Sequence, residues 1–84
     1  MNPDNSFQQV LTALDAYASS DFEAYDDLMA EGFMFARHEI GWSKHELKDA
    51  IKRAQNDELT VDDAASIARW ANFMRQRLRE FGRM

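Results

Sequence analysis

Apolar residues recur at intervals of three and four along four stretches of the chain, which is the spacing of amphipathic helices. In the first stretch the shared face comprises Phe7, Val10, Leu11, Leu14 and Tyr17. The sequence has three glycines and one proline, too few for the many turns of a β domain. We therefore predict an all-α fold, a compact single domain over residues 1–84, with helices at about residues 5–18, 21–31, 44–55 and 61–81.

Helix boundaries follow from residues that satisfy backbone groups at helix ends. Two Ser-x-x-Glu pairs have the spacing of a capping box: Ser20 with Glu23, and Ser43 with Glu46. The last helix is expected to begin after Thr60. Glycines are expected to stop the second and fourth helices, at Gly32 and Gly82.

The connector at residues 32–42 is apolar for a segment between helices. Its residues Phe33 to Phe35 can form a short extended segment, one helical turn or a loop. Large apolar side chains in a connector are rarely left exposed, so we expect all three to complete the core.

Both histidines, His38 and His45, lie in or beside this connector, each followed by a glutamate. They do not have the spacing of a zinc site, and the chain has no cysteine. No glycine-rich phosphate loop or nucleophile elbow is present either. We therefore expect no metal, no cofactor and no enzymatic activity.

Charge is unevenly distributed along the chain. Residues 1–36 carry seven acidic residues and no lysine or arginine, whereas residues 66–84 carry five arginines and one glutamate. The overall net charge is −5. Such asymmetry points to an interaction with an oppositely charged partner.

The acidic residues predict a partner-binding face on the second helix. Glu23, Asp27 and Glu31 follow at four-residue spacing, where like charges repel, and Asp15 and Asp26 extend the set. Two interpretations remain open. The stripe meets a basic partner, or it pairs with the chain's own lysines on the third helix, which are Lys44, Lys48 and Lys52.

The C-terminal arginines form an alternative basic face. Arg75, Arg79 and Arg83 are four residues apart, which suits phosphate, but cations also complement the end of a helix. The negative total charge argues against general nucleic-acid affinity, so we do not expect direct nucleic-acid binding.

Part of the sequence resembles a known family. The segment LDAYASSDFEAYDDLMAEGFMF followed by GWSKHELKDAI is similar to the opening of small nuclear transport factor 2-like domains, where two helices precede a strand and a third helix. That family continues with several long strands, whereas this chain continues with a long helix pattern. We therefore carry over neither its fold nor its activity.

These patterns favour a protein that binds another protein. The sharpest hypothesis is a small acidic inhibitor or adaptor that occupies a basic surface of a nucleic-acid-binding complex. In size and acidity it resembles, as a class, phage anti-CRISPR and anti-restriction proteins. The alternatives are a nucleic-acid-binding or regulatory module using the basic helix, and a small helical homodimer or structural subunit. Without a secretory signal or an apolar run of membrane length, we expect a cytoplasmic protein.

Overall fold

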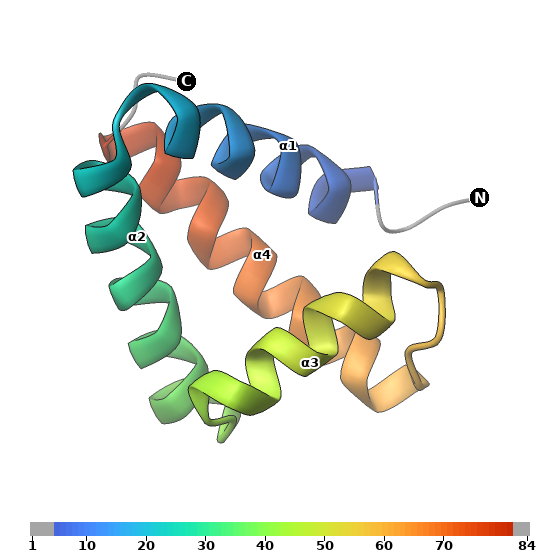
Figure 1. The fold of residues 1–84 in the computed structure, drawn as a ribbon. Coiled ribbons are helices and arrows are strands. Elements are labelled where there is room, and N and C mark those ends of the chain that lie inside the picture. Colours follow the sequence, from blue (N-terminus) through green and yellow to red (C-terminus); the bar gives the residue numbers. More distant parts are fainter. Residues whose placement is uncertain (1–4, 82–84) are drawn as a thin grey trace.

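The computed structural model describes residues 5–81 and confirms the all-α fold. Helix α4 packs against the other three helices, with α1 along one side, α2 along the other and α3 crossing near its start (Figure 1). No strand occurs within residues 5–81. The elements are α1 (Asn5–Ser20), α2 (Phe22–Phe35), the π-helical turn η1 (Ala36–Ile40), α3 (Lys44–Gln55) and α4 (Val61–Phe81).

The core lies around Trp70 of α4, whose side chain is completely buried. Its ring centroid is 6.5 Å from that of Phe7, at an interplanar angle of 58°, so the aromatic contact joins α1 to α4. Each of the four helices contributes apolar side chains to this core, but Phe22, which was predicted to lie on the apolar face of the second helix, is 68% exposed. The other buried core residues include Val10, Leu14, Leu28, Leu47, Ala50, Ile67, Ala71, Met74 and Leu78.

Gly32 does not stop the second helix, contrary to the prediction from sequence. Helix α2 continues through it to Phe35. Gly32 is buried where α2 meets α4, and a Cβ atom there would lie 2.7 Å from Met74 Sδ and 3.1 Å from Trp70 Nε1. The glycine is therefore needed for close packing of the two helices and not for a turn.

The connector at 32–42 is helical as far as Ile40 and contains no strand. After α2 the helix continues as the wider π-helical turn η1. The N–H groups of Gly41 and Trp42 both donate to Ala36 O, at 2.8 and 3.0 Å. Gly41 then takes a left-handed conformation with φ of 86°, which glycine tolerates best, and the helix ends.

The three large apolar residues at 33–35 are only partly buried. Phe33 and Phe35 are half-buried and pack against the core. Met34 is 60% exposed, so the prediction that all three side chains complete the core is wrong for this residue. Because α2 stays helical here, consecutive side chains point about 100° apart and cannot all face inward.

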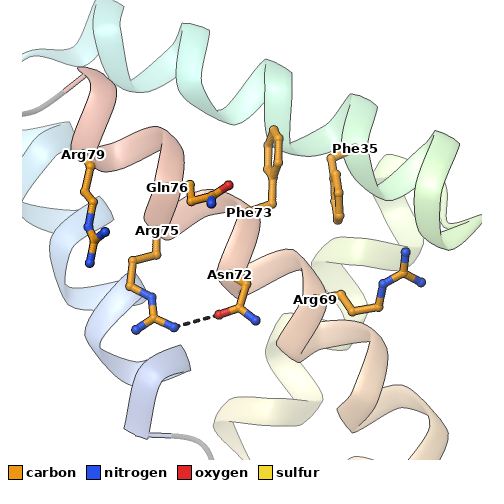
Figure 2. Close-up of a pocket in the computed structure, with 7 residues that line it drawn as sticks. All are labelled: Phe35, Arg69, Asn72, Phe73, Arg75, Gln76 and Arg79. Atoms are coloured by element: carbon orange, nitrogen blue, oxygen red, sulfur yellow. Dashed lines mark hydrogen bonds between the residues drawn. The ribbon is translucent and has the colours of Figure 1, made fainter.

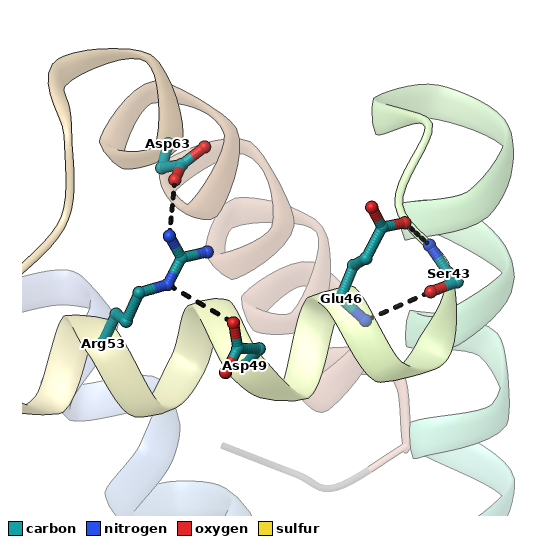
Figure 3. Close-up of polar contacts among 5 residues, drawn as sticks. All are labelled: Ser43, Glu46, Asp49, Arg53 and Asp63. Atoms are coloured by element: carbon teal, nitrogen blue, oxygen red, sulfur yellow. Dashed lines mark hydrogen bonds and ion pairs between the residues drawn. The ribbon is translucent and has the colours of Figure 1, made fainter.

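One of the two predicted capping boxes forms. Ser43 N–H donates to Glu46 Oε1 at 2.8 Å and Glu46 N–H donates to Ser43 Oγ at 3.1 Å (Figure 3). At the start of α2 the cap is Asp21, which accepts from Ala24 N–H at 3.1 Å, whereas Ser20 still belongs to α1.

The start of α4 was predicted correctly. The helix begins after Thr60, whose hydroxyl oxygen accepts from Asp63 N–H at 3.2 Å. The predicted stop at Gly82 lies outside the described residues.

Helix α3 is joined to the start of α4 by a charged contact. Arg53 Nη1 lies 3.1 Å from Asp63 Oδ2, and Arg53 Nε lies 3.7 Å from Asp49 Oδ2 within α3 (Figure 3). The Asp63 side chain is 26% exposed, so water screens this pair less than a typical surface pair. The contact links the last turns of α3 to the first turn of α4.

We predict that the capping box at α3 contributes measurably to stability. Ser43→Ala combined with Glu46→Ala removes both capping hydrogen bonds and should lower the free energy of unfolding by about 1 kcal/mol. Ser20→Ala is the control, because Ser20 does not cap α2 and its exposed hydroxyl makes only a long 3.3 Å hydrogen bond to Tyr17 O, and it should leave stability within about 0.5 kcal/mol of the parent. Chemical denaturation measures both, and equal losses in the two variants would contradict the assignment of the caps.

Candidate binding surfaces

The outer side of α2 carries an acidic face, defined here as Glu23, Asp26 and Asp27. All three side chains are exposed and lie within about one and a half turns of the helix. Phe22, at the start of the same helix, is 68% exposed. Asp15, which was predicted to join this set, is exposed on α1.

Glu31, the last member of the predicted stripe, has an internal partner. Its Oε1 lies 2.7 Å from Arg77 Nε of α4, and the Glu31 and Arg77 side chains are 41% and 27% exposed. The hydrogen bond with Glu31 raises the pKa of Arg77 above its ordinary value, and the charge of Glu80, which also contacts Arg77, acts in the same direction. This ion pair joins α2 to α4, so Glu31 has a structural role.

The lysines of α3 do not neutralise the acidic face. Lys44 Nζ lies 4.9 Å from the centroid of the Phe33 ring, a cation–π contact. Lys48 and Lys52 are exposed and form no ion pair with any residue between 5 and 81. Over the same residues, none of the three carboxylates of the acidic face has an ion-pair partner. Their charge is therefore directed to solvent.

A second surface is an open groove of about 520 Å³ along α4, called here the basic groove (Figure 2). Its apolar part is formed by Phe35 and Phe73, whose rings stack with centroids 4.4 Å apart and planes at 12°. The polar lining residues are Arg69, Asn72, Arg75, Gln76 and Arg79.

The arginines of the basic groove are weakly engaged. Arg75 Nη2 donates to Asn72 Oδ1 at 2.7 Å. Arg69 Nη2 is 4.0 Å from Glu39 Oε1, and both side chains are 57% exposed, so this contact contributes little. Arg79 has no ion pair within the part of the chain that the structure describes.

Sequence reasoning found only part of this groove. It identified Arg75 and Arg79, whereas the third predicted member, Arg83, lies outside the described residues. It missed Arg69, although the spacing of residues 69, 72, 76 and 79 places them along one side of a helix. Phe35 comes from α2, so only the tertiary structure brings it to the groove.

The histidines are not gathered into a site. His38 and His45 are both exposed, and the chain leaves helical geometry between them at residues 41–43. Among the described residues no group of three or more potential ligands could hold a metal ion. Likewise, none of the described helices is long and apolar enough to cross a membrane.

The broad apolar stripe of α4 is largely covered within one chain. Trp70 is fully buried, and Phe73 is half-buried against Phe35. Internal packing therefore accounts for most of this stripe and leaves little of it to support a homodimer.

No family model, no curated protein and no solved structure matches this chain at a significant level. The features of the chain that bear on its function are therefore its two charged surfaces, which are the acidic face of α2 and the basic groove of α4.

We predict that Glu31 and Asp27 differ in their effect on stability, although both are acidic residues of α2. Glu31→Gln breaks the pair with Arg77 and should lower the free energy of unfolding by about 0.5–1 kcal/mol, a discounted value because both side chains are partly exposed. Asp27→Asn removes the same charge from an unpaired position and should change stability by less than about 0.5 kcal/mol. Thermal melts compare the two, and an equal effect would show that the Glu31–Arg77 pair contributes nothing specific.

Proposed function

We propose that this protein acts by binding a basic surface of another protein through the acidic face of α2, without catalysing a reaction. The observation that supports this proposal is the set of three exposed carboxylates, Glu23, Asp26 and Asp27, with no ion-pair partner within residues 5–81. In its sharpest form, the protein is an inhibitor or adaptor of a nucleic-acid-binding complex, of the phage anti-CRISPR or anti-restriction type.

The arrangement of these acids has a cost for the isolated protein. Glu23 and Asp27 are four residues apart on one helix, where like charges repel by a few tenths of a kcal/mol. Cations on a partner would attract both carboxylates and so offset the repulsion between them. Basic surfaces of this kind are typical of proteins that bind nucleic acids, whose phosphates they would otherwise contact.

Phe22 supplies an apolar anchor beside the charges. Its side chain is 68% exposed, and its ring centroid lies 6.0 Å from that of Tyr25, which is half-buried. Aromatic residues that are buried on binding contribute most of the energy of many protein interfaces, whereas exposed charges mainly steer association. An aromatic ring followed by three acids therefore suits a small interface with electrostatic steering.

A cytoplasmic partner fits this proposal. The chain has no cysteine and so does not depend on an oxidising compartment for disulfides. Nucleic-acid-binding complexes of the type proposed work in the same reducing environment.

We predict that reversing the acidic face abolishes partner capture and leaves the fold intact. Glu23→Lys with Asp27→Lys changes two exposed positions and should move stability by no more than about 1 kcal/mol in total. The control is Glu58→Lys with Asp62→Lys, which changes the net charge equally and, like the test variant, removes one acid from the first turn of a helix. The measurement is affinity capture from the native host cell together with thermal melts of each protein.

The parent and the control should capture the same partner, and the α2 variant should lose it. The loss should appear mainly as slower association at low salt, because the charges steer the encounter. Capture that persists in the α2 variant, or is lost equally in the control, would contradict the proposed role of the acidic face.

A further inference from the structure

The basic groove has the composition of a site for a phosphate chain. Its cations are all arginines, whose planar guanidinium groups bind phosphate oxygens through two parallel hydrogen bonds. Asn72 and Gln76 lie between them and add amide donors, which also contact phosphates and sugars in nucleic-acid complexes. Within the part of the chain that the structure describes, no carboxylate lines the groove.

The length of the groove sets the size of the ligand. Arg69 and Arg79 are ten residues apart on α4, which corresponds to about 15 Å at 1.5 Å per residue. A strand with the duplex rise of about 3.4 Å would cover this length with about four nucleotides, and a more extended single strand would cover it with fewer. Arg75 lies between the two ends, and it extends to the same side of α4 as Arg79 (Figure 2).

We propose that the basic groove binds a short segment of single-stranded nucleic acid, with Arg69, Arg75 and Arg79 each contacting a phosphate. The stacked rings of Phe35 and Phe73 form an apolar wall beside these arginines, against which a base can pack. A positively charged groove that follows the backbone, combined with aromatic rings, is the general design of sequence-tolerant single-strand sites.

An acidic peptide is the competing ligand of similar charge. It would satisfy the arginines equally well, but aspartate and glutamate side chains offer no flat ring that could pack against Phe35 and Phe73. The groove is also open to solvent and is lined mainly by α4, so it suits a flexible strand more than a rigid duplex. These features favour single-stranded nucleic acid.

The net charge of −5 limits this site without excluding it. Repulsion from the acidic face grows as the bound strand lengthens beyond the groove, so affinity should be greatest for segments of about four to six nucleotides at low salt. The basic groove and the acidic face share no residue, so each can be tested without the other.

The experiment measures the fluorescence anisotropy of a labelled single-stranded DNA hexamer as protein is added, at several salt concentrations. The test variant is Arg69→Gln with Arg79→Gln, which leaves the Arg75–Asn72 hydrogen bond intact. The control is Lys48→Gln with Lys52→Gln, which removes the same charge from exposed positions on α3. A polyglutamate peptide and a DNA duplex of equal charge serve as competitors.

We expect saturable binding of the hexamer by the parent and by the lysine control. Three phosphate contacts predict that log K falls with log salt at a slope of about −2, and the arginine variant should bring this slope to about −0.7. The arginine variant should also weaken binding by at least about tenfold, because each lost contact is a hydrogen bond to a charged group.

Three results would overturn the proposal. The first is no saturable binding of the hexamer at low salt. The second is an equal loss in the arginine and lysine variants, which would show binding by net charge alone. The third is competition by polyglutamate or by the duplex at the same concentrations as unlabelled hexamer, which would assign the groove to a different ligand.

Discussion

The close approach of α2 to α4 at Gly32 is the constraint on which the remaining structure depends. The missing side chain at Gly32 lets the backbone of α2 pack directly on Trp70 and Met74, two fully buried residues of α4. This contact fixes the rotation of α2 about its own axis. The rotation turns Leu28 into the core, directs the acidic face to solvent and brings Phe35 onto the ring of Phe73. Both candidate binding surfaces are therefore consequences of one helix crossing.

The sequence predicted those features that depend on neighbouring residues and missed those that depend on the crossing. Periodicity located the four helices, and the Ser43–Glu46 pair located the start of α3, since each is a local property. Gly32 was interpreted as a stop because glycine at the end of an apolar pattern usually has that role, and its packing partners lie about forty residues later. Asp21 replaced Ser20 as the cap of α2 because adjacent residues of similar capping ability compete for the same position. The basic groove needed Phe35 from another helix, which periodicity within α4 does not reveal.

The acidic and basic regions of the sequence also stay apart in the folded protein, except where one ion pair connects them. The Glu31–Arg77 pair neutralises one acid of α2 and one base of α4 at their interface. The unpaired carboxylates of α2 and the weakly engaged arginines of α4 then face different surroundings, each with exposed or half-exposed aromatic residues beside it. A small chain of net charge −5 can thus present one surface for a cationic partner and another for an anionic one.

A double-mutant cycle between Gly32 and Met74 tests the central role of the helix crossing most directly. In the parent, Gly32→Ala should lower the free energy of unfolding by about 1–2 kcal/mol, because crowding against Met74 and Trp70 outweighs the gain in helix propensity. In the background of Met74→Ala, which opens space next to Gly32, the same change should cost at least about 1 kcal/mol less. Chemical denaturation of the four proteins gives the coupling energy. Additive effects, or stabilisation by Gly32→Ala alone, would contradict the account, since α2 and α4 would then not depend on close contact at this residue.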